Sequence, residues 1–93
     1  MKLPIHYSEA NWKTRKRCRE QYIQEQNNKC MFCNESLDKK PPDPIANAEI
    51  DLGLFPIGFF KYPVHLQHNH DTDLTEGAVH SRCNAYMWIY EGR

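Results

Sequence analysis

The sequence lacks a long hydrophobic run. No apolar stretch approaches the roughly 18 residues of a membrane span, and the start, Met1-Lys2-Leu3-Pro4, lacks the apolar core of a secretory signal. Internal repeats and low-complexity segments are also absent. We therefore expect one cytosolic domain over residues 1–93, with no membrane partner.

The chain also lacks a net charge, because 12 Lys and Arg residues balance 12 Asp and Glu residues. This balance gives no global field of the kind that draws a protein onto nucleic acid. The charges are unevenly spread, however. Residues 1–29 hold seven Lys or Arg and three Glu, a local charge of +4, and the remaining residues carry −4. A basic first third permits local attraction to phosphate.

Glycine and proline are absent from Ser8 to about Asn27, where Arg, Lys, Glu and Gln are frequent. This stretch predicts one long helix with Ser8 as its N-cap. Arg15 and Arg19 interrupt its apolar face, where they either pack over it, pair with a carboxylate or point toward a bound phosphate. The apolar face itself consists of Trp12, Cys18, Tyr22 and Ile23, of which the cysteine is expected to be a small buried hydrophobe.

After residue 29 the sequence predicts shorter elements. The apolar stretch 55–60 is expected to pack irregularly under the core rather than to insert between DNA bases. The other expected elements are an extended proline-rich connection over 39–44, a weak strand over 46–52, a strand over 62–67, a polar turn over 69–76, a strand ending at Ala78 or Val79, and a helix from near His80 to Gly92. The predicted fold class is α+β.

The cysteines suggest what holds so short a chain together. A domain of this size buries only about 60–65% of its unfolded surface, so an apolar core alone is marginal. Disulfides are unexpected in the cytosol. Cys30-x-x-Cys33 and His80-x-x-Cys83 each have the spacing of zinc-ligand pairs, and we expect them to form one closed structural Zn²⁺ site. The alternative is a redox-active cysteine pair with His80 an ordinary surface histidine.

A second cluster of reactive side chains lies between the two halves of this site. His65, His68 and His70 fall within six residues at the end of a predicted strand. This density is too high for core filling, because a buried imidazole requires a polar partner. The cluster indicates a functional site, and the alternatives are an adventitious metal cluster or a solvated turn.

The stretch from His65 to Asn84 reads H-L-Q-H-N-H-D-T-D-L-T-E-G-A-V-H-S-R-C-N. It resembles the HNH, or ββα-metal, nucleases, and most closely the recombination endonuclease VII branch, whose pattern runs H-x-D-H-x-H-x-T-G-x-x-R-G-x-x-C-x-x-C-N. The patterns align without a gap, and with the upstream cysteine pair the resemblance spans residues 30–84. Seven positions match: His65, His68, His70, Thr72, Gly77, Cys83 and Asn84.

Four positions depart from the family pattern. His80 replaces a zinc-binding cysteine, which is conservative because imidazole also binds zinc. Asp73 replaces a turn glycine, and Glu76 replaces an arginine near the expected phosphate. Gln67 replaces the aspartate that binds the catalytic metal in many relatives, and this departure matters most.

The resemblance implies a zinc-stapled, treble-clef-like ββα-metal domain: a basic helical region over 1–29 and a core over 30–93 with a β-hairpin and a C-terminal helix. It implies that His68 acts as general base and that Asn84 and Gln67 hold a catalytic divalent cation, Mg²⁺ or Mn²⁺. Because Gln67 offers only a neutral oxygen, His65 or His70 would favour a softer ion such as Ni²⁺ or Co²⁺.

The function implied is metal-dependent hydrolysis of phosphodiester bonds in DNA, nicking or cutting with little sequence preference. The protein would be a monomer or weak dimer, in the bacterial host cytosol if it is phage-encoded. The alternatives are a catalytically silent zinc module that binds DNA or a protein, and an inhibitor of a host defence system. Phosphate contacts are expected from four basic residues that otherwise are simply solvated: Arg82, Lys13, Lys16 and Arg17.

Overall fold

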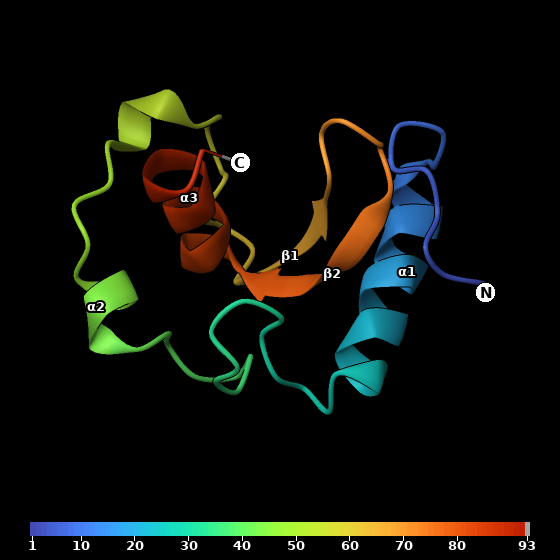
Figure 1. The fold of residues 1–93 in the computed structure, drawn as a ribbon, viewed down its shortest axis with the longest axis horizontal. Coiled ribbons are helices and arrows are strands. Elements are labelled where there is room, and N and C mark those ends of the chain that lie inside the picture. The colour runs from blue at the N-terminus through green and yellow to red at the C-terminus, as the bar shows by residue number, and fades with distance from the viewer. Residues whose placement is uncertain (93) are drawn as a thin grey trace.

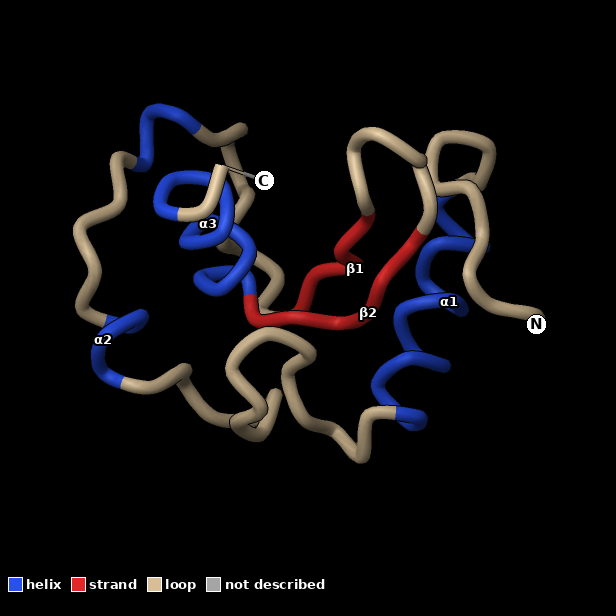
Figure 2. Tube along the Cα trace, viewed as in Figure 1, coloured by secondary structure: helices blue, strands red, loops and turns tan. Residues whose placement is uncertain are grey.

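The computed structural model describes residues 1–92 and has helices on both sides of a two-stranded antiparallel hairpin (Figures 1 and 2). The predicted α+β class is therefore confirmed. No helix among residues 1–92 is long and apolar enough to cross a membrane. The elements in chain order are α1 (Trp12–Glu25), α2 (Asp43–Ala46), the 3-10 helix η1 (Leu52–Leu54), β1 (Val64–His68), β2 (Thr75–His80) and α3 (Ser81–Tyr90).

The hairpin has one irregularity, and it lies beside the histidine cluster. Gln67 pairs with Gly77, but His68 pairs with Thr75, so the register shifts between Gln67 and His68. Glu76 is the extra residue on β2, and it is exposed. An extra residue of this kind bends its strand and changes the direction of neighbouring side chains. The bulge therefore affects how His68 projects from the end of β1.

The outer edge of β2 is closed by a side chain from the end of α1. Gln26 accepts a hydrogen bond from the Ala78 amide at 2.8 Å and donates one to the Ala78 carbonyl at 2.9 Å. The amide of Met31 donates to the same carbonyl at 2.9 Å. A Cβ on Gly77 would lie 2.7 Å from Gln26 Oε1, so only glycine allows this close approach. The outward-facing amide and carbonyl of Ala78 thereby have hydrogen-bond partners without a third strand.

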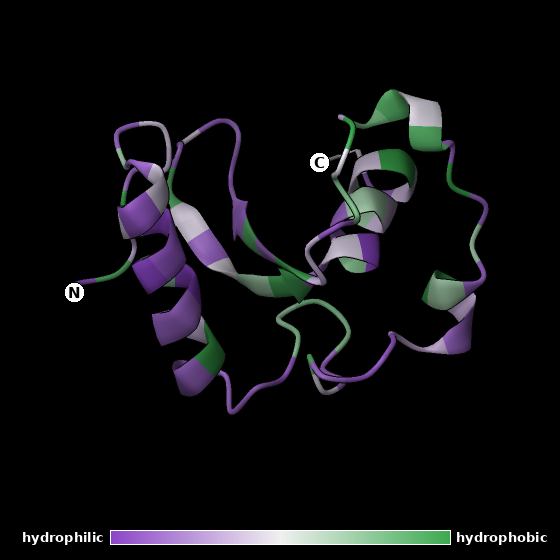
Figure 3. Ribbon diagram, turned by 180° about the vertical axis from the view of Figure 1, so that it is seen from behind, coloured by the Kyte–Doolittle hydropathy of each residue, from purple (hydrophilic) through white to green (hydrophobic). Residues whose placement is uncertain are grey.

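The core is small and is formed around β2, the cysteine turn and α3. Tyr22, Ile23 and Phe32 pack against it and are partly buried, whereas most of α1 is hydrophilic (Figure 3). Cys18 is completely buried, as the sequence predicts. The buried members of the core are Cys30, Leu37, Ala78, Val79, Cys83 and Met87.

The long helix begins three residues later than the sequence predicts. Its N-cap is Asn11, whose side chain accepts a hydrogen bond from the amide of Thr14 at 2.9 Å. Ser8 is not the cap because it is held elsewhere: its hydroxyl and its amide both donate to the carboxylate of Asp73. At the other end, Asn27 and Asn28 adopt positive φ angles and terminate the helix near the predicted position.

The segment of residues 5–8 is docked on the turn of the hairpin. Ile5 and Thr75 exchange hydrogen bonds, and the amide of Tyr7 donates to the carbonyl of Asp73 at 2.8 Å. Asp73, at the position where the endonuclease VII pattern has a glycine, has a φ of 64° and so takes the left-handed conformation that a glycine would supply. Its hydrogen bonds from Ser8 lower the pKa of its carboxyl. The substitution keeps the turn and adds an anchor for the N-terminal segment.

The connection between the cysteine turn and the hairpin differs most from expectation. The strand predicted over 46–52 is wrong. This segment runs from the last residue of α2 to the first residue of η1, and it pairs with no strand in the described part of the chain. The proline-rich stretch is also not wholly extended. Pro44 lies in the first turn of α2, where the missing amide hydrogen costs nothing.

Two groups of aromatic side chains also lie outside the positions expected of them. Trp12 is 70% exposed and does not join the core. Phe55, Phe59 and Phe60 pack on one another, with ring centroids 4.6–5.9 Å apart, and Phe59 also contacts the ring of His65 at 4.6 Å. They form a satellite cluster beside β1 rather than a layer under the core.

Candidate functional site

Cys30, Cys33, His80 and Cys83 converge on one point. Their ligand atoms all lie within 4.8 Å of one another. Nδ1 of His80 is 3.4 Å from Sγ of Cys33 and 3.6 Å from Sγ of Cys83. The usual zinc–sulfur and zinc–nitrogen bond lengths give about 3.5 Å between the ligands of a tetrahedral ion. The four residues can therefore hold a metal ion such as zinc.

The imidazole of His80 is oriented so that Nδ1 faces the three sulfur atoms. Its Nε2 lies 2.9 Å from the carbonyl of Ser36 and 2.8 Å from that of Lys39, so this nitrogen carries the proton. The neutral ring then presents the lone pair of Nδ1 to a metal. Hydrogen bonding of the outer ring nitrogen to a carbonyl is the usual support of a metal-binding histidine.

The thiols are prepared unequally for metal binding. A hydrogen bond from Cys83 lowers the pKa of Cys30 to about 4, with help from backbone amides that include that of Cys33. The same hydrogen bond raises the pKa of Cys83, and burial raises that of Cys33. One thiolate is thus already favoured, and metal binding must release the remaining protons.

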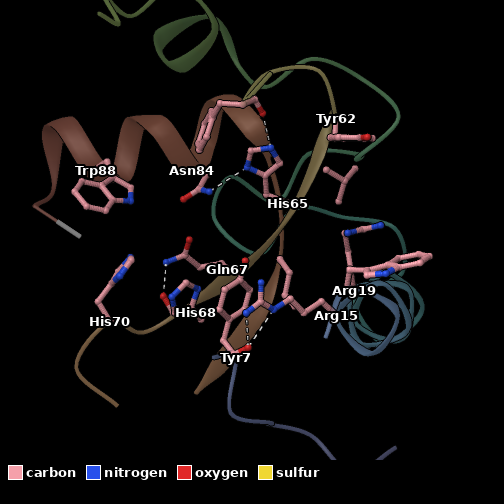
Figure 4. A pocket seen from close by; sticks show the side chains of 14 residues that line it. Tyr7, Arg15, Arg19, Tyr62, His65, Gln67, His68, His70, Asn84 and Trp88 are labelled. Carbon is pink, nitrogen blue, oxygen red and sulfur yellow. Dashed lines mark hydrogen bonds between the residues drawn. The ribbon is translucent and has the colours of Figure 1, made fainter. Parts of the chain in front are cut away.

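A cleft of about 440 Å³ lies over β1, between α1 and α3 (Figure 4). The histidine cluster and Asn84 line this cleft, together with Gln67. Asn84 follows the metal-ligand candidate Cys83 directly, in the first turn of α3. A metal ion held by Cys30, Cys33, His80 and Cys83 would link the start of α3 to the turn after α1 and so help to position Asn84.

His65 orients the amide of Asn84. Nε2 of His65 donates to the carbonyl of Phe59 at 2.8 Å, so Nδ1 is the acceptor for the Asn84 Nδ2 group at 3.1 Å. Burial lowers the pKa of His65, which favours this neutral state. With its nitrogen engaged, Asn84 keeps its oxygen free of hydrogen bonds within residues 1–92. Both ring nitrogens of His65 are used, so this residue supports Asn84 and is not a free metal ligand.

Gln67 presents a second amide oxygen to the cleft. The residue is 4% exposed, and its Nε2 donates to the carbonyl of His68 at 3.1 Å. No hydrogen bond to its Oε1 comes from residues 1–92, and in Figure 4 this amide lies between the imidazole of His68 and the amide of Asn84. Two neutral oxygen atoms of this kind suit a hydrated divalent cation, although no carboxylate lines the cleft.

His68 is held by stacking and not by hydrogen bonds. The ring of Tyr7 lies 3.9 Å from it and is nearly parallel, at 7°. Arg15 lies over the other face of Tyr7 at 3.8 Å and donates two hydrogen bonds to its carbonyl. Neither ring nitrogen of His68 has a hydrogen-bond partner within residues 1–92. The stack fixes the plane of the imidazole and leaves its nitrogens available to water.

The surroundings of His68 keep its imidazole neutral. Burial lowers its pKa below the ordinary 6.5, and the nearby His70 and Arg15 act in the same direction, against the carboxylates of Asp73 and Glu76. His70 is exposed and lies between two rings, 4.6 Å from that of His68 and 5.3 Å from that of Trp88. A neutral imidazole at neutral pH can accept a proton.

The basic residues expected to contact phosphate do not line this cleft. Arg82 lies against a separate hollow and donates to the carbonyl of Ala48 at 2.9 Å, so it is held by the connection after α2. Lys13, Lys16 and Arg17 are exposed on α1, and none of them lines the cleft. This correction follows from the docking of α1: the face turned toward β1 is the one that carries Arg15 and Arg19.

Several residues of the cleft were not singled out as site residues from the sequence. Trp12, Arg15 and Arg19 follow helical spacing and so share a face of α1, which is a usable signal. Trp88 lies four residues after Asn84 on α3 and could have been found in the same way. Tyr7 lies outside every regular element, and nothing in the sequence indicates that it stacks on His68.

The metal cluster makes a direct prediction. Purified protein should contain one equivalent of zinc, and His80→Ala should lose the metal and several kcal/mol of stability, a large part of the ~5–15 kcal/mol that such domains possess. Elemental analysis and thermal unfolding with and without a chelator measure both effects. Cys18→Ala is the matched control, because Cys18 is equally buried but lies outside the cluster. Full retention of zinc in His80→Ala would contradict the assignment.

Comparisons of the chain with protein-family models, with curated proteins and with solved structures found no match.

Proposed function

We propose that this protein is a metal-dependent DNA endonuclease of the HNH type, in which His68 activates water. The observation that carries the proposal is that the start of α3 contributes both to the Cys and His cluster and to the cleft. The Cys30, Cys33, His80 and Cys83 cluster fixes the start of the helix, and the next residue, Asn84, directs its amide into the cleft that His68 also lines. The order of these residues along the chain is that of the endonuclease VII pattern.

His68 has the properties of a general base. Its ring plane is set by Tyr7, its nitrogens have no hydrogen-bond partner among residues 1–92, and its pKa is lowered by burial. In this role it takes a proton from a water molecule that attacks the phosphorus atom. A positioned base of this kind contributes about 10²- to 10⁴-fold to the rate.

Asn84 and Gln67 would hold the catalytic cation through their two uncommitted amide oxygens. The ion, when bound, would stabilise the charge that develops on the phosphate and on the leaving oxygen. Because both ligands are neutral, the phosphate of the substrate must supply much of the attraction. His65 acts indirectly, because its hydrogen bond with the Asn84 amide keeps the oxygen of that amide toward the cleft. Arg15 and Arg19 add positive charge to the lining of the same cleft.

Replacement of the base tests the activity. The full chain should cleave plasmid DNA in the presence of Mg²⁺, Mn²⁺, Ni²⁺ or Co²⁺, and His68→Ala should lower the cleavage rate at least about 100-fold with the zinc content unchanged. His6→Ala is the matched control, since His6 is exposed and lies outside the cleft. Equal cleavage by His68→Ala and the parent protein would refute the proposal.

The pH dependence of cleavage follows from the lowered pKa of His68. A general base works when it is neutral, so activity should fall as the pH drops through the pKa of His68. Because burial, His70 and Arg15 lower that pKa, the midpoint of the acid limb of kcat/KM should lie below 6.5. Arg15→Gln removes one of these causes and should move the midpoint upward. An acid limb centred above 6.5 in the parent protein would contradict this role.

A second candidate is a catalytically silent zinc module that binds DNA or a protein. The observation that favours it is the absence of a carboxylate from the cleft within residues 1–92. Asp71 and Glu76 line an adjoining hollow with His68. Divalent cations such as Mg²⁺ are usually bound with at least one carboxylate, so binding here would be weak.

Substitution at Gln67 separates the two candidates. Gln67→Asp adds a carboxylate to the cleft and should increase cleavage with Mg²⁺ about tenfold or more if the site is catalytic but weak in metal binding. Gln67→Asn has the same length without the charge and should give no increase. Cleavage rates over a Mg²⁺ titration measure the difference. If neither the parent protein nor Gln67→Asp cleaves DNA with any of the four cations, the silent module is the better description.

A further inference from the structure

The cleft combines exposed aromatic rings with positive charge. The chain has two tryptophans, and both line this one cleft: Trp12 is 70% exposed and Trp88 is 50% exposed. Tyr62, which also lines it, is 63% exposed. Large aromatic side chains are mostly buried in proteins, so three that line one cleft with at least half of their surface exposed point to a ligand with flat faces.

The charge of the cleft favours an anion. Arg15 and Arg19 both line it, and no carboxylate does so within the described residues. Arg19 forms no hydrogen bond or ion pair with residues 1–92. The guanidinium of Arg15 is anchored to the carbonyl of Tyr7, so its position is fixed while its charge stays uncompensated. A polyanion with stackable rings satisfies both features of the cleft.

We infer that the cleft binds an unpaired, single-stranded segment of DNA, whose bases stack on Trp12, Tyr62 and Trp88 and whose backbone contacts Arg15 and Arg19. This inference rests on the proposed function and names its substrate class. Bases in a duplex have their faces covered by neighbouring pairs, so only unpaired bases can use aromatic rings in this way. A cleft of about 440 Å³ has room for a few nucleotides of a single strand.

The positions of these side chains also indicate the path that a bound strand would follow through the cleft. In Figure 4, Tyr62 and Arg19 lie on one side of His68, Gln67 and Asn84, and Trp88 and His70 lie on the other. Trp12 shares its helix face with Arg15 and Arg19. A strand that stacks at both ends of the cleft would therefore pass its phosphates over His68 and Asn84.

The two tryptophans make the test direct, because both report on the cleft. Tryptophan fluorescence of the full zinc-loaded chain is titrated with a 12-nucleotide single-stranded DNA, its blunt duplex and the RNA of the same sequence, with no divalent cation added. We expect quenching by the single-stranded DNA and at least tenfold tighter binding of it than of the duplex. Equal or tighter binding of the duplex overturns the inference, and so does preferential binding of the RNA.

Variants test each part of the surface. Trp12→Ala and Trp88→Ala should each weaken binding of the single-stranded DNA by about 5- to 100-fold, the range for loss of one stacking platform. Ile57→Ala is the control for a nonspecific apolar surface, since Ile57 is fully exposed but lines another hollow. Unchanged affinity in both tryptophan variants, or an equal loss in Ile57→Ala, contradicts the inference.

Arg19→Gln should lower the affinity and reduce the salt dependence of binding by about one phosphate contact. Arg17→Gln is its matched control, because Arg17 lies on the same helix but lines a different hollow; equal effects of the two variants contradict the contact. This binding test needs no cleavage. Tight single-strand binding without cleavage removes only the proposed hydrolysis, whereas cleavage of duplex DNA with no single-strand preference removes only this inference.

Discussion

The convergence of three sulfur atoms and one imidazole is the constraint on which the rest of the structure depends. Cys30 and Cys33 come from the turn after α1, and His80 and Cys83 come from the junction of β2 and α3. Few buried side chains join these segments otherwise, because the core is small. A metal ion held there would link three elements at once and set the angle at which α3 leaves the hairpin. The position of Asn84 follows from that angle.

Much of the fold could be predicted because local chemistry determines it. The absence of glycine and proline indicated α1, the strand predicted over 62–67 lies close to β1, and ligand spacing indicated the metal cluster. The N-cap was wrong because Ser8 has a long-range partner in Asp73, and no local pattern reveals a contact across 65 residues. The strand predicted over 46–52 failed for a related reason: alternation indicates a strand only if a neighbouring strand can pair with it.

The candidate site was predictable in part. Its polar residues, His65, His68, Gln67 and Asn84, follow a spacing that the sequence displays, and they line one cleft. Their individual roles depend on hydrogen bonds that spacing does not encode. The sequence suggested His65 as a metal ligand. In the structure its Nε2 donates to the carbonyl of Phe59 and its Nδ1 accepts from the Asn84 amide. Arg82 appeared to be placed for phosphate, yet the carbonyl of Ala48 holds it away from the cleft.

The stack of Tyr7 on His68 has a consequence for biosynthesis. The two rings are 61 positions apart in the sequence, and the anchor of the N-terminal segment, Asp73, is made later still. During translation Tyr7 is synthesised before the hairpin. The residues on which Tyr7 packs, including His68, are in place only after the hairpin has been made. A polypeptide that stops before α3 therefore has the tyrosine without an assembled cleft, and the imidazole of His68 becomes ordered only after the residues of the hairpin and α3 have been made.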